Sequence, residues 1–102
     1  MNVEAIFKVL ANPVRVRILT WLKAPEDNFP PMCNLPEGED KAYVCVGVIQ
    51  EKAGVTQSTA SHYLNLMHQA GLLSYKRIGQ WTYYRRNEET LRQLADYVAN
   101  QL

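Results

Sequence analysis

One predicted helix presents an outward face of short amide, hydroxyl and imidazole side chains. Residues 55–73 form this helix when successive side chains are set about 100° apart, with Thr56 as its N-cap and Gly71 at its end. A solvated helix usually presents Lys and Glu, but this outward face has no formal charge. Side chains of this size suit base edges and phosphate oxygens in a DNA major groove. The residues expected to contact DNA from this helix are Gln57, Ser58, Thr59, Ser61, His62 and Asn65.

The opposite face of the same helix is apolar and is expected to lie on a core. Its members are Ala60, Tyr63, Leu64, Met67 and Ala70. Before it, residues 45–53 carry apolar side chains at helical spacing, and Gly54 ends that segment. A helix, a short glycine-containing turn and a second capped helix make a helix-turn-helix, predicted over residues 44–70.

Two aromatic-rich segments follow, separated by a turn at residues 77–80, and they predict a β-hairpin wing over residues 72–86. Alternation along the second strand places at least one of Trp81, Tyr83 and Tyr84 in the core. Each element alone has an ordinary structural explanation, but the three in this order favour DNA binding. The wing residues expected at DNA are Lys76, Arg77, Gln80 and Arg85.

These motifs resemble the ArsR/SmtB family of bacterial winged-helix repressors. The resemblance rests on Thr56-Gln-Ser-Thr-Ala-Ser-His-Tyr-Leu, on Ala70-Gly-Leu-Leu and on Arg77-Ile-Gly-Gln-Trp-Thr-Tyr-Tyr. Residues 7–19, in which Asn12-Pro13 caps a helix, are similar to the family's opening helices, and only residues 24–42 fall outside the resemblance. It implies a homodimer that represses by binding a palindromic operator in double-stranded DNA and releases it when an inducer binds. The implied fold is a winged helix-turn-helix, mainly α with a β-hairpin wing (α+β): four helices, two strands and a last helix.

Length and composition agree with a small cytoplasmic DNA-binding protein. The 102 residues make one domain, residues 1–102, with a modest core. No apolar run approaches the roughly 20 residues that span a membrane, and the first residues lack the basic region of a signal peptide. We therefore expect a cytoplasmic protein without a membrane partner.

Charge is segregated along the chain although the net charge is only +1. Residues 52–87 contain Lys and Arg but no Asp or Glu, whereas residues 25–40 contain Asp and Glu but no Lys or Arg. The basic segment coincides with the predicted DNA surface, where phosphates would lie. Neutralising several phosphates predicts binding that weakens steeply with salt.

Apolar stripes at the two ends of the chain predict a dimer. A core of this size cannot cover both stripes, and an uncovered apolar stripe marks a partner surface. The alternative is that the last helix, predicted over residues 88–102, packs only on its own core. In the family, the first and last helices pair across the two-fold axis. The expected interface residues are Ile6, Val9, Leu10, Leu91, Leu94, Ala95, Val98 and Leu102.

The candidate residues for sensing an inducer are the two cysteines, Cys33 and Cys45. Cys45 matches a cysteine that ligates metal in metal-sensing members of the family, but Gly47 and Val48 stand where those members carry further ligands. The two thiols could form a reversible disulfide, bind arsenite or a soft metal, or in the case of Cys45 simply be small and buried. Residues 88–102 contain no histidine, so we expect no zinc or nickel site there.

Residues 24–42 are predicted to be a long acidic, proline-rich loop, with four prolines and no helical or strand periodicity. Loops longer than about 12–15 residues tend to be functional or disordered, so this one is either the sensor-specific part or a tolerated insertion. Its acids are expected to keep it away from DNA. Phe29, Met32 and Leu35 could dock on the core and hold Cys33 near Cys45.

Two other classes of function fit less well. The chain has no nucleophile elbow, no glycine-rich phosphate loop and no paired carboxylates on one face, so we expect no enzyme. A winged-helix module for protein–protein contact would carry an apolar or charged outer face on residues 57–70. The amide and hydroxyl face found there argues against that alternative.

Overall fold

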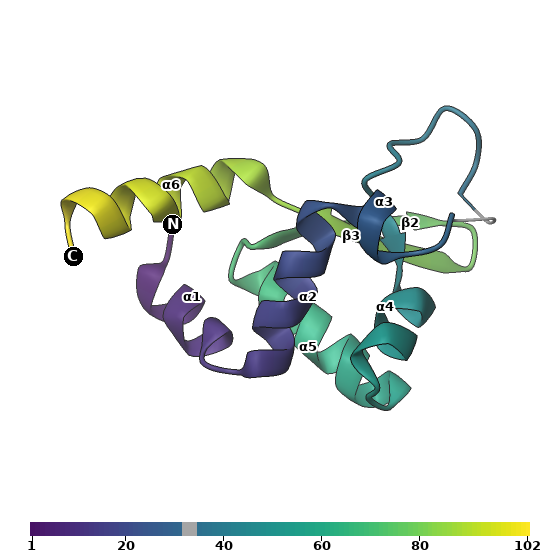
Figure 1. The fold of residues 1–102 in the computed structure, drawn as a ribbon, viewed down its shortest axis with the longest axis horizontal. Helices are drawn as coiled ribbons and strands as arrows, with labels where there is room; N and C mark the ends of the chain where they lie inside the picture. The colour runs from purple at the N-terminus through teal and green to yellow at the C-terminus, as the bar shows by residue number, and fades with distance from the viewer. Residues whose placement is uncertain (32–34) are drawn as a thin grey trace.

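Helices pack with a small antiparallel sheet in the computed structural model, which describes residues 1–31 and 35–102. In this part of the chain there are six helices and three strands (Figure 1). In chain order they are α1 (Val3–Leu10), α2 (Pro13–Lys23), α3 (Pro25–Asn28), β1 (Val44–Cys45), α4 (Val46–Ala53), α5 (Gln57–Gln69), β2 (Leu73–Ile78), β3 (Trp81–Arg86) and α6 (Glu88–Asn100). The winged helix-turn-helix predicted from the sequence is therefore confirmed.

Side-chain caps fix where the main helices begin. The Asn12 Oδ1 accepts hydrogen bonds from the backbone N–H groups of Val14 and Arg15 at 2.9 and 3.2 Å, and Pro13 is the first residue of α2. The Thr56 hydroxyl accepts from the backbone N–H of Thr59 at 3.2 Å and so starts α5. Each cap satisfies N–H groups that have no partner inside the helix. Both caps were predicted from the sequence.

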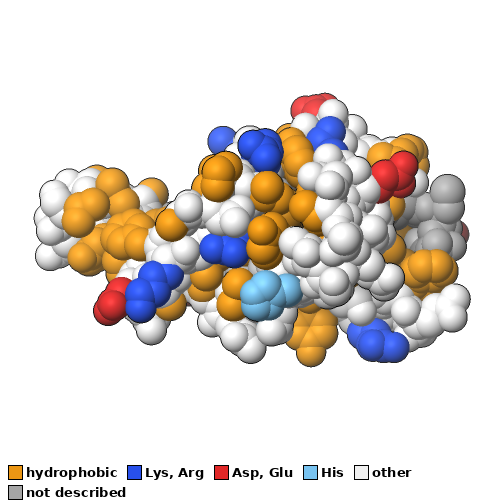
Figure 2. Space-filling view, turned by 90° about the horizontal axis from the view of Figure 1, so that it is seen from below, with side chains coloured by type: hydrophobic (Ala, Val, Ile, Leu, Met, Phe, Trp, Pro, Cys, Tyr) orange, Lys and Arg blue, Asp and Glu red, His pale blue; other side chains and the backbone are white. Residues whose placement is uncertain are grey.

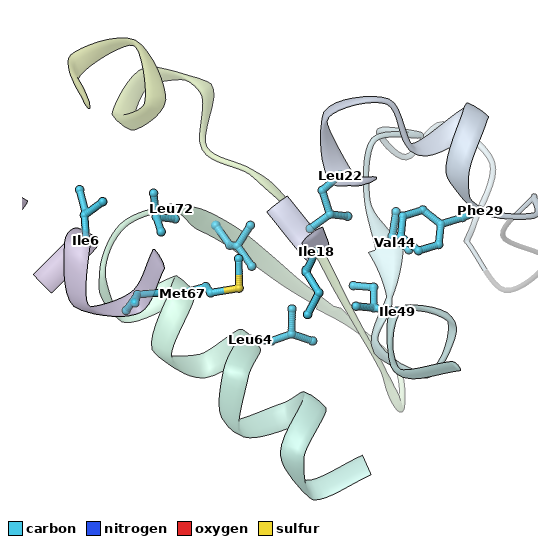
Figure 3. Packing of buried hydrophobic residues seen from close by; sticks show 11 residues of the cluster. Ile6, Ile18, Leu22, Phe29, Val44, Ile49, Leu64, Met67 and Leu72 are labelled. Atoms are coloured by element: carbon cyan, nitrogen blue, oxygen red, sulfur yellow. The ribbon is translucent and has the colours of Figure 1, made fainter. Parts of the chain in front are cut away.

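The core lies where α2, α4 and α5 meet, and Figure 3 shows Ile18 of α2 between Leu64 of α5 and Ile49 of α4. These three side chains are fully buried. Leu64 shares this burial with two neighbours on the apolar face predicted for its helix, Ala60 and Met67. Burial of this face orients α5, because the opposite face must then point to solvent.

The sheet has the strand order β1-β3-β2, with both pairs antiparallel. β2 and β3 form the predicted hairpin, and Gly79 turns the chain with φ +61°. The two residues of β1 pair with Tyr83 and Tyr84 of β3. This strand was not predicted, because two residues carry no periodic pattern and gain their partner only when the chain folds.

Two predicted segments need corrected boundaries. The helix expected over residues 55–73 covers only Gln57–Gln69, since Gly71 adopts φ +84° and Leu73 already belongs to β2. The loop expected over residues 24–42 begins with α3, where Phe29 N–H donates to the Pro25 carbonyl at 2.9 Å. Phe29 is buried as predicted and lies edge-on to Trp21 at 6.4 Å, whereas Met32 and Cys33 lie outside the described residues.

The apolar stripes of α1 and α6 differ in how far the protomer itself buries them. Ile6 and Val9 of α1 are 0% and 8% exposed, so the expectation that they form a partner surface is wrong: they belong to the core. By contrast, α6 contains no buried residue and projects away from the sheet, with the C-terminus at its far end (Figure 1). No helix in the described part of the chain is long and apolar enough to cross a membrane.

Candidate nucleic-acid interface

The outward face of α5 is exposed, as the sequence predicted. Its side chains at Gln57, Ser58, Ser61, His62 and Asn65 are all exposed. Within the described residues, Gln57, Ser61 and Asn65 make no side-chain hydrogen bond that would occupy them. The helix therefore presents a row of free donors and acceptors without a formal charge.

Thr59 differs from the other candidates on this helix. Its hydroxyl accepts from the Thr56 hydroxyl at 2.9 Å, and its side chain is half-buried. Thr59 thus completes the cap of α5, and its hydroxyl is less available than that of Ser61. The exposed Ser58 hydroxyl also lies 3.4 Å from the Thr56 hydroxyl.

Tyr63 anchors the exposed helix to the junction of α1 and α2. The Asn12 side-chain amide donates to the Tyr63 hydroxyl at 3.3 Å, and the Arg15 guanidinium lies 5.0 Å from the centre of its ring. Arg15 Nε also donates to the Val9 carbonyl at 2.7 Å. Arg15 is consequently a structural residue that fixes the angle of α5 against the body of the protein.

The last turn of α5 is tied to the wing. His68 Nδ1 lies 3.0 Å from the Leu73 carbonyl, and its ring is edge-on to Tyr75 at 4.8 Å. Tyr75 in turn lies 6.0 Å from Tyr84. At about 100° per residue His68 falls on the same side of α5 as Ser61 and Asn65, but the returning strand β2 partly covers it. The same strand exposes Tyr75, which alternation along β2 would not have identified, because Tyr75 falls on the same side of the strand as the buried Leu73.

The tip of the wing carries Arg77 and Gln80, both exposed. Arg77 Nε donates to the Gly79 carbonyl at 3.4 Å, within the turn itself. Trp81 is 38% exposed, whereas Tyr83 is fully buried, which confirms that one of the wing aromatics belongs to the core. Burial raises the pKa of Tyr83 above its ordinary value, with a further contribution from the nearby Cys45 thiol.

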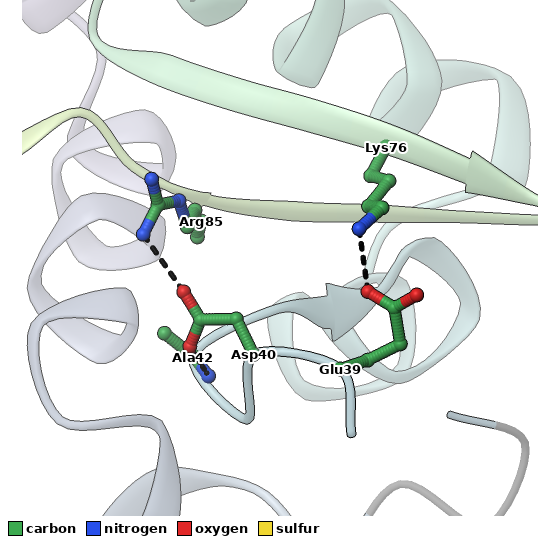
Figure 4. Close-up of polar contacts among 5 residues, drawn as sticks. All are labelled: Glu39, Asp40, Ala42, Lys76 and Arg85. Atoms are coloured by element: carbon green, nitrogen blue, oxygen red, sulfur yellow. Dashed lines mark hydrogen bonds and ion pairs between the residues drawn. The ribbon is translucent and has the colours of Figure 1, made fainter. Parts of the chain in front are cut away.

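The other two basic wing residues face an unexpected neighbour. Lys76 pairs with Glu39, and Arg85 pairs with Asp40 at 2.8 Å between Nη1 and Oδ2 (Figure 4). The hydrogen bond from Lys76 to Glu39 raises the pKa of the lysine above its usual range. The sequence predicted a basic wing and an acidic loop as separate features, but the fold brings the two together.

Of the two cysteines, Cys45 lies in the described part of the chain. Cys45 is half-buried, directly precedes α4 and pairs with Tyr83 in the sheet. Its predicted partner Cys33 lies outside the described residues, so their proximity stays a prediction. Among residues 1–31 and 35–102, no group of three or more His, Cys, Asp and Glu side chains could hold a metal ion.

Apolar side chains gather at the end of the molecule formed by α6 and α1, as the view from below shows (Figure 2). Val98 is 46% and Leu102 is 78% exposed, and Phe7 of α1 is 39% exposed. The Phe7 ring lies 6.5 Å from Tyr97 of α6. Leu91 and Leu94 are half-buried against the core.

The chain is similar to known regulators over nearly its whole length. It is 44% identical over 99 residues to an uncharacterized HTH-type transcriptional regulator, YbzH, of Bacillus subtilis (strain 168), covering 95% of each chain. The transcriptional repressor SdpR of the same organism is 27% identical over 95 residues, covering 93% of this chain and 87% of SdpR. No protein-family model matches the chain.

A solved structure extends this similarity to the fold. The homodimeric winged helix-turn-helix DNA-binding domain Mb0332 from Mycobacterium bovis, described as a possible ArsR-family regulator, superposes with a TM-score of 0.65. The two sequences are 28% identical, and the match covers 97% of this chain and 79% of the other. With its exposed helix-turn-helix, its wing and these relatives, the chain belongs to the ArsR family of winged helix-turn-helix transcriptional regulators.

Proposed function

We propose that the chain is a homodimeric repressor that binds a palindromic operator with α5 in the major groove. The observation that carries this proposal is the exposed face of α5, whose free amide and hydroxyl groups lie on a helix held by a buried opposite face. Such groups read base edges and contact phosphates. In this proposal, Gln57, Ser58, Ser61, His62 and Asn65 make the contacts, with Thr59 at the edge.

The wing extends this interface along the DNA. Arg77 and Gln80 lie at its tip and are proposed to reach the backbone or the minor groove. Lys76 and Arg85 belong to the same interface, but each is paired with a carboxylate in the free protein. Arg77 is thus the wing cation that is most available to a phosphate.

Two copies of the chain are proposed to meet through α6. The protomer leaves Val98 and Leu102 exposed and buries Leu91 and Leu94 only in part, and the similar domain Mb0332 is described as homodimeric. A two-fold axis there would place two copies of α5 on successive major grooves, about 34 Å apart. The interface would contain Phe7 and Leu10 of α1 with Leu91, Leu94, Ala95, Val98 and Leu102 of the C-terminal segment. This repressor would act on chromosomal DNA in the cytoplasm.

Release from DNA is proposed to depend on Cys45, with Cys33 as its partner. Because Cys45 directly precedes α4, a change at its sulfur would disturb the start of the helix-turn-helix. Oxidation to a disulfide, or binding of arsenite or a soft metal by both thiols, would produce that change. Replacing Cys45 by Ser should make DNA binding insensitive to all three treatments, while sensitivity retained by the variant would exclude this thiol as the sensor.

The test is fluorescence anisotropy of the reduced protein on the labelled DNA upstream of its own gene, at several salt concentrations. A double variant, Ser61→Ala with His62→Ala, should lose most of its affinity while its melting temperature hardly changes, because both side chains are exposed. Gln93→Ala, an exposed polar residue on α6 outside the apolar stripe, is the matched control and should bind as the wild type. Equal affinity of the double variant and the wild type would show that α5 is not the recognition helix. An absence of binding by the wild type would favour a protein–protein module.

A further inference from the structure

Residues 36–42, called the acidic turn here, lie against one side of the wing (Figure 4). Backbone hydrogen bonds shape this turn: the Glu39 N–H donates to the Pro36 carbonyl, and the Tyr43 N–H to the Asp40 carbonyl, each at 3.2 Å. Gly38 adopts φ +89°, a conformation that favours glycine. The turn therefore holds its carboxylates in a defined position.

Both oxygens of the Asp40 carboxylate are engaged. Oδ1 accepts from the Ala42 N–H at 2.9 Å, and Oδ2 accepts from Arg85. One residue earlier, Glu39 accepts from Lys76. The Tyr43 ring completes the contact, since it lies 5.9 Å from Lys76 Nζ and 5.3 Å from Arg85 Cζ. Two cations of the wing thus meet two carboxylates and one ring of the same short segment.

Strand register explains why these two cations, and not Arg77, are paired. Lys76 and Arg85 occupy positions whose side chains share one side of the hairpin, because Lys76 pairs with Tyr83 and Arg85 with Ser74. Arg77 pairs with Thr82 and lies on the other side. The acidic turn covers only the side that carries Lys76 and Arg85.

We propose that the acidic turn restrains DNA binding by holding Lys76 and Arg85, with the Glu39 and Asp40 carboxylates in the role that DNA phosphates would otherwise take. This inference rests on the proposed function. Carboxylates and phosphates are equivalent partners for these cations. The four side chains are only partly buried, between 26% and 46% exposed. Ion pairs exposed to this degree contribute little to stability and open easily, so the wing cations are exchangeable between the turn and DNA.

The restraint is electrostatic as well as competitive. Even when the pairs open, two negative charges remain within the screening length of about 10 Å at moderate salt. Removing the carboxylates should therefore raise the affinity for DNA and also increase the number of phosphates that the wing neutralises. The second effect is measurable by itself, because the dependence of log K on log salt steepens by about 0.9 for each additional phosphate contact.

The experiment compares Glu39→Gln/Asp40→Asn with Glu26→Gln/Asp27→Asn by anisotropy on the operator and on a random-sequence duplex. Both double variants remove two negative charges, but Glu26 and Asp27 lie in α3, outside the acidic turn, are exposed and form no ion pair with the wing in the described structure. We expect the first variant to bind at least tenfold more tightly than the wild type on both duplexes, with a salt dependence steeper by 0.9 or more. The control should show a smaller gain and an unchanged slope.

Equal gains in the two double variants would overturn the inference, because the effect would then be one of net charge. Weaker binding by Glu39→Gln/Asp40→Asn would also overturn it and would identify the turn as a support that DNA binding needs. In both cases, operator binding by the wild type remains and the proposed function stands. If neither the wild type nor any variant binds either duplex, the proposed function and this inference fail together.

Discussion

Val98 offers a direct test of whether α6 is the dimer interface. It lies on the apolar stripe of α6 and is 46% exposed in the protomer, so about half of its surface is still available to a partner. A Val98→Glu substitution should therefore leave the protomer folded but place a carboxylate inside the interface. Gln93→Glu adds the same charge on the polar side of the same helix and serves as the matched control.

The expected magnitude follows from burial and symmetry. Complete burial of a valine side chain contributes about 1.5–3 kcal/mol, so the exposed half of Val98 contributes about 1 kcal/mol per protomer. An unpaired carboxylate in the interface costs at least about 1 kcal/mol more. Each substitution occurs twice in a two-fold dimer, so the free energy of dimerisation should become less favourable by about 4 kcal/mol or more. The dimer should therefore weaken by roughly 1,000-fold.

Sedimentation analysis over a range of protein concentrations measures this change. We expect Val98→Glu to sediment as a folded monomer at micromolar concentration and Gln93→Glu to remain dimeric. Circular dichroism should show the same helix content for both variants. A Val98→Glu protein that stays dimeric with unchanged affinity would refute the assignment of the α6 stripe to the interface.

Three further predictions concern the fold that supports the proposed DNA surface. Leu64→Ala removes a fully buried side chain on which α5 packs, so chemical denaturation should show a loss of about 2–5 kcal/mol. Gly54 adopts φ +68° with open space around it, so Gly54→Ala should lower the free energy of unfolding by about 1 kcal/mol. Gly47 lies inside α4, so Gly47→Ala should raise the free energy of unfolding by about 0.5 kcal/mol in the same assay. Because burial raises the Tyr83 pKa above 10.0, the folded state holds that proton more tightly, and the free energy of unfolding should fall as the pH rises above 10.0. Tyr83→Phe should flatten this fall and remove one late-ionising tyrosine from the ultraviolet titration, and an unchanged titration would contradict the burial.

The two parts of the proposed DNA surface, α5 and the wing, are connected to their neighbours through different contacts. The last turn of α5 meets the wing through His68 and Tyr75, whereas the opposite side of the hairpin meets the acidic turn through Lys76 and Arg85. The wing is thus held between α5 and a segment outside the family resemblance. A change in that segment would reach the proposed DNA surface through the wing.

The helices of this protein are largely determined by local sequence. The Asn12 and Thr56 caps, the buried face at Ala60, Leu64 and Met67 and the exposed polar face of α5 all follow from spacing along the chain. Helical periodicity fixes which side chains share a face, and capping needs only a residue within three positions. The order of helix-turn-helix and wing was predictable for the same reason.

The tertiary structure decided what depends on residues distant in sequence. The two-residue strand β1 exists only because Tyr83 and Tyr84 supply its partner. Ile6 and Val9 of the α1 stripe are core because they meet the body of the protomer, while Val98 and Leu102 of the C-terminal stripe stay exposed. The pairing of Lys76 with Glu39 and of Arg85 with Asp40 joins residues 37 and 45 positions apart. Sequence spacing carries no information about such contacts, because loop closure and strand register decide which charged side chains meet. Composition gives only the number of these charges.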